Sequence, residues 1–213
     1  MKSLFLCLSL AVWPALSGTV TVPTVPAAPI ALYVDFQQTP PRTVLSAVEE
    51  EVENIMTPAG MRLEWRSLAG VHGNEVSAEL AVVRFKGRCD IANLNLHPPE
   101  GGALGWTHIS DGVVLPFSDV DCGKIRAFLQ SGLLAVPAKL REEVFGRAVG
   151  RVLAHELYHI FAKTQHHGSQ GVAKPAYTVR DLLSNEFVFE ERQSDELRNG
   201  QPHPLPDVIN LTR

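Results

Sequence analysis

Residues 137–163 read PAKLREEVFGRAVGRVLAHELYHIFAK and form the longest helical pattern in the chain. Apolar residues recur in this segment every three or four positions, and this spacing puts them on one face of an α-helix. The apolar face consists of Val144, Phe145, Ala148, Val149, Val152, Leu153, Leu157 and Ile160. The segment therefore predicts a long helix with one side buried against the rest of the protein.

The C-terminal half of this helix contains the pattern His155-Glu156-Leu157-Tyr158-His159. Residues four apart lie on the same face of a helix, so the imidazoles of His155 and His159 can share one zinc ion. Glu156 projects beside them, outside the coordination shell, and can take a proton from a zinc-bound water. A helix with two solvated histidines and a surface glutamate is the alternative. We favour a hydrolytic zinc site with Glu156 as its general base.

Catalytic zinc requires a third protein ligand and an open position for water. Three downstream residues are candidates: His166, His167 and Glu191. A structural site with a fourth ligand, such as His166 beside the other three, would leave no room for water. The residues alone do not decide among these possibilities.

The helical motif resembles that of the zincin metallopeptidases, and a third histidine soon after the second resembles their metzincin branch. The usual metzincin pattern is His-Glu-x-x-His-x-x-Gly-x-x-His, whereas here Ala162 and Gln165 occupy the glycine and third-histidine positions. The chain is more similar to a variant metzincin with an extended loop before the third histidine. In that form His167 falls at the ligand position, and Gly171-Val172-Ala173 falls at the turn below the metal, with Ala173 replacing methionine.

The resemblance to a metzincin implies the fold and the activity together. It implies one α+β, zincin-like domain, with a twisted mixed sheet packed on a backing helix and an active-site helix. It implies a secreted zinc metallopeptidase with His155, His159 and His167 as metal ligands. An edge strand within residues 104–117 would border the cleft and bind extended peptide, and Tyr177 could assist the transition state.

Two other functions are compatible with the same residues. One is a non-catalytic, secreted zinc-binding protein (a pseudoenzyme) on the same fold. The other follows from a resemblance to the gluzincins, which take a glutamate from a later helix in the pattern Glu-x-x-x-Asp; Glu191 and Asp195 fit this spacing.

The rest of the chain predicts strands and helices in an order that agrees with an α+β domain. Residues rich in β-branched and aromatic side chains, or alternating in polarity, predict the strands. The predicted strands are 30–36, 61–66, 79–85, 103–108 and 113–117. Helical spacing predicts one helix that begins near Pro41 and ends near Thr57. It also predicts shorter helices at 179–183 and 190–198.

The N-terminus has the pattern of a secretory signal peptide. Met1-Lys2 gives a positive start, Leu4–Trp13 is apolar, and small residues surround Ser17, the expected cleavage site. An uncleaved anchor is the alternative, but the apolar run is shorter than the ~20 residues that a helical span needs. We predict a signal peptide at 1–17 and therefore a secreted or periplasmic protein.

Beyond the signal peptide, we predict a proline-rich linker at 18–29, one peptidase domain at 30–200 and a tail at 201–213. Two cysteines remain, Cys89 and Cys122. An oxidising compartment favours a disulfide between them over two free thiols.

Composition excludes some partners. The chain is 45% hydrophobic and 20% charged, with a formal net charge of -4, which is ordinary for a soluble globular protein. No basic surface is indicated for nucleic acid, and no polybasic segment for a membrane. We expect a monomer that acts on a peptide or protein substrate.

Overall fold

The computed structural model describes residues 29–92, 94 and 101–200. The predicted signal peptide, most of the predicted linker and the predicted tail at 201–213 lie outside these residues. Within the part that is described, no helix combines the length and the apolar character needed to cross a membrane.

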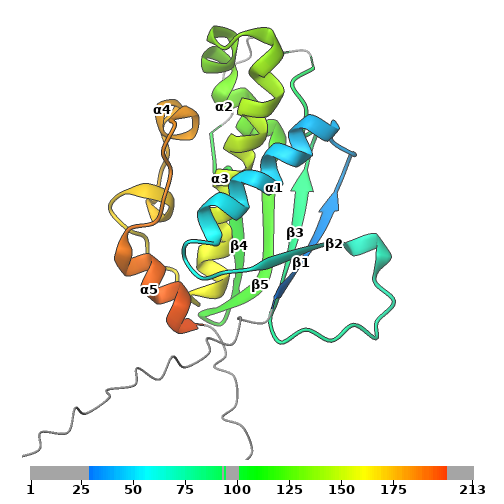
Figure 1. The fold of residues 1–213 in the computed structure, drawn as a ribbon, viewed down its shortest axis with the longest axis vertical. Coiled ribbons are helices and arrows are strands. Elements are labelled where there is room, and N and C mark those ends of the chain that lie inside the picture. Colours follow the sequence, from blue (N-terminus) through cyan, green and yellow to red (C-terminus); the bar gives the residue numbers. More distant parts are fainter. Residues whose placement is uncertain (1–28, 93, 95–100, 201–213) are drawn as a thin grey trace, which may run out of the picture.

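One five-stranded sheet runs through the domain in the order β2-β1-β3-β5-β4 (Figure 1). The strands are β1 (Ile30–Phe36), β2 (Leu63–Ser67), β3 (Leu80–Lys86), β4 (Gly105–Ser110) and β5 (Val113–Asp121). Neighbouring strands from β2 to β5 are parallel, and only β4 is antiparallel to its neighbour. The antiparallel strand therefore lies at one edge of a mixed sheet.

Five α-helices accompany the sheet among the described residues. They are α1 (Arg42–Met56), α2 (Cys122–Ala135), α3 (Arg141–Phe161), α4 (Val179–Leu183) and α5 (Glu191–Gly200). Short 3-10 helices occur at η1 (Leu68–Gly70), η2 (Ala138–Leu140) and η3 (Gly171–Ala173). The predicted α+β class, with a single mixed sheet, is confirmed.

The sequence-based assignment missed α2 and gave β5 too short an extent. The last residue of β5, Asp121, caps α2 by accepting a hydrogen bond from the backbone N–H of Lys124. Ile125, Leu129 and Leu133 follow at a spacing of four and are completely buried. A capping aspartate followed by this spacing is the signal that predicts the helix.

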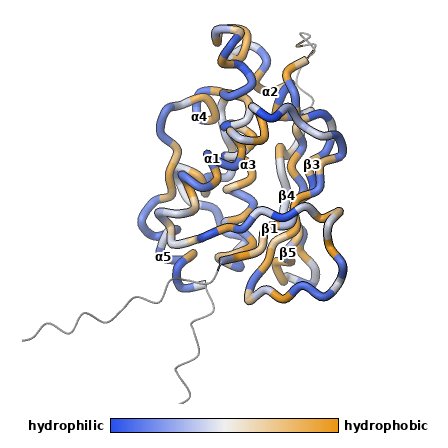
Figure 2. Tube along the Cα trace, turned by 45° about the vertical axis from the view of Figure 1, so that its right-hand side comes forward, coloured by the Kyte–Doolittle hydropathy of each residue, from blue (hydrophilic) through white to orange (hydrophobic). Residues whose placement is uncertain are grey.

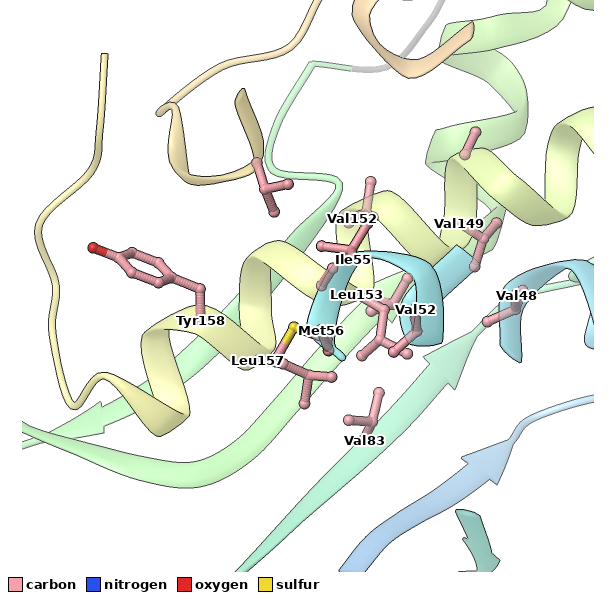
Figure 3. Close-up of a cluster of buried hydrophobic side chains, with 14 of the residues drawn as sticks. Val48, Val52, Ile55, Met56, Val83, Val149, Val152, Leu153, Leu157 and Tyr158 are labelled. Atoms are coloured by element: carbon pink, nitrogen blue, oxygen red, sulfur yellow. The ribbon is translucent and has the colours of Figure 1, made fainter. Parts of the chain in front are cut away.

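Helix α3 lies at the centre of the packing. From Phe145 to Phe161 every residue except Arg147 is buried. Figure 3 shows Val149, Leu153 and Leu157 of α3 facing residues of α1 and Val83 of β3. Apolar stretches concentrate in the central strands in Figure 2, whereas α5 is mainly hydrophilic.

Two glycines allow α1 and α3 to approach closely. A Cβ on Gly146 would lie 2.6 Å from the backbone oxygen of Val44 and 2.7 Å from Cβ of Ala47. A Cβ on Gly150 would lie 3.0 Å from the backbone oxygen of Val48. Since none of these contact atoms lies at the far end of a flexible side chain, larger residues would force the two helices apart.

A disulfide between Cys89 and Cys122 joins the segment after β3 to the first residue of α2, as predicted. Both cysteines are buried. In the loop-entropy model a cross-link over this span stabilises the fold by about 3–4 kcal/mol.

Replacement of Gly146 by alanine is expected to lower the free energy of unfolding by about 1–3 kcal/mol, the usual cost of overpacking. The loss should occur although alanine has the higher helix propensity. Urea denaturation of the metal-free protein measures it. Gly132→Ala is the matched control, because the atoms nearest to its Cβ would belong to the side chains of Leu183 and Val179 and not to a backbone. An equal loss in both variants would contradict the role of the α1–α3 contact.

Candidate metal centre

Helix α3 presents His155 and His159 to each other on one face. Their Nε2 atoms are 3.1 Å apart, and each residue is only 8% exposed. The Nδ1 atom of His155 lies 2.8 Å from the backbone oxygen of Val172, and Nδ1 of His159 lies 2.8 Å from that of Thr164. Because a carbonyl oxygen only accepts, each Nδ1 must carry the proton.

This assignment leaves both Nε2 atoms without a proton in the neutral imidazoles. Two bare nitrogens cannot hydrogen-bond to each other, so their 3.1 Å separation is unfavourable unless a cation lies against both. Two nitrogens bound to one tetrahedral zinc at 2.0–2.1 Å are about 3.3 Å apart. The pair therefore has the spacing and the tautomers of two metal ligands.

His167 joins this pair from the loop after α3. Its ring centroid is 5.2 Å from that of His155 and 4.8 Å from that of His159. One possible ligand atom from each of the three residues lies within 4.8 Å of the others. Across the described part of the chain, this is the only group of three histidine, cysteine or acidic residues with such geometry.

The other two candidates for the third ligand lie outside this group. His166 is exposed, and its backbone N–H donates to Oγ1 of Thr164. Glu191 is an exposed residue at the start of α5. Three histidines that could hold a metal ion are thus present, and they are the three that the resemblance implied.

The turn η3 contacts the Nδ1 side of the His155 imidazole. Val172 and Ala173 are completely buried in it, and the Val172 carbonyl accepts from His155. The Tyr177 hydroxyl donates to the same carbonyl and lies 2.9 Å from Nδ1 of His155. Tyr177 therefore contacts the Nδ1 side of His155, whereas the Nε2 side faces His159. Burial raises the pKa of Tyr177 well above its usual value, so the hydroxyl keeps its proton.

Burial also keeps His155 neutral near physiological pH. It lowers the pKa of His155 to about 3, partly opposed by the hydrogen bond to Val172. Burial is likewise the main cause of the lowered pKa of His159 and of His167. A neutral imidazole is the form that binds a metal ion.

Glu156 lies next to the histidine pair and is 4% exposed. Burial raises the pKa of its carboxyl group to about 7, although the hydrogen bond from Thr107 acts in the opposite direction. Oγ1 of Thr107 is 2.8 Å from Oε2 of Glu156. A carboxyl group with a pKa near neutrality can both take up and release a proton at physiological pH.

Two cavities flank the centre. One of about 440 Å³ is lined by residues that include Phe128, Val152, Glu156 and Tyr177. The other, of about 310 Å³, contains all three histidines in its lining. Gly105 of the edge strand β4 and Glu156 border both. The candidate metal centre is therefore accessible from a groove beside an unpaired strand edge.

Comparison with known proteins assigns no family to the chain. No protein-family model and no curated protein sequence matches it. A function is therefore inferred from the arrangement of the three histidines and Glu156 alone.

Replacement of His167 by alanine is expected to weaken zinc binding by at least about 100-fold, because two imidazoles alone leave the ion with one protein ligand fewer. His166→Ala removes the adjacent histidine and should bind zinc as the unaltered protein does. Competition with a chromophoric chelator measures both affinities. Reversed effects of the two variants would make His166 the ligand.

The metal-free protein should lose stability as the pH falls from 6.5 toward 3. In this range the unfolded chain binds a proton at residue 155 that the folded protein does not, because the folded pKa is about 3. The slope from His155 alone is at most about 1.4 kcal/mol per pH unit. Glu156 acts oppositely between pH 4.5 and 7, since its folded pKa is raised.

Urea denaturation at several pH values, compared with His155→Gln, isolates the contribution of His155. The variant should lose less stability on acidification. If both proteins show the same pH dependence, His155 is not held neutral by the fold.

Proposed function

We propose that the chain is an exported zinc-dependent peptidase that uses His155, His159 and His167 as zinc ligands and Glu156 as general base. The observation that carries this proposal is the convergence of three imidazoles beside a buried carboxyl group on a solvent-accessible groove. Each part has a separate physical argument.

The donor set suits zinc. Imidazole nitrogens are favourable ligands for zinc, and three protein ligands with one open position are typical of its catalytic sites. The backbone carbonyls of Val172 and Thr164 accept from Nδ1 of the first two ligands. Such contacts fix the orientation and the tautomer of metal-binding histidines.

His155, His159 and His167 would hold the zinc ion, which would lower the pKa of a coordinated water toward neutrality and polarise a substrate carbonyl. Glu156 accepts the proton of the attacking water and returns it to the leaving amine. Tyr177 keeps its contact with His155 and holds that imidazole in place.

The groove favours an extended peptide as substrate. Strand β4 pairs only with β5 among the described strands, so its outer edge offers backbone donors and acceptors to a peptide. Gly105, Trp106 and Thr107 of this strand line the cavity that contains the three histidines. A peptide aligned on this edge would bring a backbone carbonyl close to Glu156.

Export agrees with the disulfide. A buried bridge between Cys89 and Cys122 fits an extracellular or periplasmic compartment, where disulfides persist.

Glu156→Ala is expected to reduce peptide cleavage by about 100- to 10,000-fold, the usual contribution of general acid–base catalysis, while zinc stays bound. The measurements are cleavage of a fluorogenic peptide library and zinc content by elemental analysis. Glu143→Ala is the matched control, because Glu143 is an exposed glutamate of the same helix. Chelation should abolish activity and zinc should restore it.

Stoichiometric zinc without cleavage of any peptide would exclude the peptidase and leave the non-catalytic zinc-binding protein. Cleavage that survives Glu156→Ala would exclude Glu156 as general base.

A further inference from the structure

The edge strand β4 contacts the carboxyl group of Glu156 through a side chain that no sequence motif indicates. Oγ1 of Thr107 lies 2.8 Å from Oε2 and 3.2 Å from the backbone oxygen of the same glutamate. The shorter contact, to a group that can carry charge, is the stronger of the two. Oε1 has no hydrogen-bond partner among the described residues, so Thr107 fixes one carboxyl oxygen and leaves the other available.

The strand also approaches Glu156 where it has no side chain. A Cβ on Gly105 would lie 2.9 Å from Oε1 and 3.0 Å from Cγ of Glu156. It would also lie 3.0 Å from Cγ1 of Val152, one turn earlier on α3. Glycine at this position therefore provides the space in which the glutamate side chain lies.

We infer that Gly105 and Thr107 form a cradle that positions the Glu156 carboxyl group for proton transfer. Gly105 determines how closely the side chain can approach the strand, and Thr107 determines how the carboxyl plane is rotated. Both are positioning residues, since they act through Glu156. This inference rests on the proposed function, because it gives Glu156 its catalytic role.

The cradle is part of a strand that is paired on one side. Thr107 is paired with Ser118 of β5, and Gly105 with Val120. The register shifts directly after Thr107, between Thr107 and Ile109. Such irregularities re-aim side chains beside functional sites. The β-branched side chain of threonine has few χ1 rotamers, so a fixed backbone fixes its hydroxyl.

A hydroxyl suits this position better than a charged group. It donates to an ionised carboxylate and accepts from a protonated carboxyl group. Thr107 can therefore remain bonded to Glu156 before and after the glutamate takes up a proton. A charged partner would hold the glutamate in only one of the two states.

The first test compares Thr107→Val with Thr107→Ser in the zinc-loaded full chain. Valine keeps the shape and removes the hydroxyl, and it should lower kcat by about 10- to 100-fold, a part of what general base catalysis contributes. KM and zinc content should stay unchanged. Serine keeps the hydroxyl and should retain most of kcat.

Ser118→Ala is the matched control. Ser118 is a buried hydroxyl residue of the adjoining strand, and it donates to the backbone oxygen of Trp106. Its loss disturbs the same pair of strands without touching Glu156, so kcat should hold. Gly105→Ala is a second probe of the cradle, and it should lower kcat although it removes no hydrogen bond.

A double-mutant cycle in the metal-free protein gives a readout independent of activity. Thr107→Val and Glu156→Gln should each shift the urea midpoint, and the double variant should shift it by less than the sum, because the two residues share one contact. Additive shifts would show that they are not coupled.

The outcomes separate the two hypotheses. If no peptide is cleaved, or cleavage survives Glu156→Ala, the proposed function fails. If cleavage requires Glu156 but Thr107→Val and Ser118→Ala have equal effects on kcat, the cradle is wrong and the peptidase stands. If Thr107→Ser loses as much activity as Thr107→Val, the hydroxyl is not the group that matters.

Discussion

The site depends on the close contact between α1 and α3. Gly146 and Gly150 face α1 where a Cβ would meet its backbone, so the two helices pack at a distance that other residues would not permit. This contact presses α3 into the core along most of its length. His155, Glu156 and His159 lie in the last two turns of α3. The position of these turns is therefore fixed by the packing of α3 on α1, which begins at Gly146.

Arg151 extends the same constraint to the segment that returns to the site. It is 1% exposed, and its Nε donates to Oε1 of Glu51 on α1 at 2.6 Å. Its Nη1 donates to the backbone oxygens of Asp181 and Leu182 at the end of α4. A buried guanidinium without these partners would be very costly. The requirement to satisfy it therefore fixes α4, and with it the chain that contains Tyr177, relative to α3.

Local patterns in the sequence were sufficient for α3 and for the histidine pair, because both depend on helical periodicity alone. They could not decide between His166 and His167, since adjacent loop residues differ only in how the loop folds back. They also gave no indication of the contact between Thr107 and Glu156. Those residues are 49 positions apart and meet because β4 packs against α3, which no local pattern encodes. The omission of α2 was different, since its cap and its spacing were present in the sequence.

The two departures from the metzincin pattern after the helix have a physical account in this chain. Many helices end in a residue with left-handed backbone, usually glycine. Here Ala162 keeps helical backbone, and Lys163 takes the left-handed conformation with φ 49°. Gln165, where the usual pattern has a histidine, donates instead to the backbone oxygen of Gly112 in the β4–β5 turn. The chain thus turns at Lys163 and is attached to this hairpin, and His167 lies beside the histidine pair. The position of His167 therefore depends on where the helix ends and on the attachment of the loop to the hairpin.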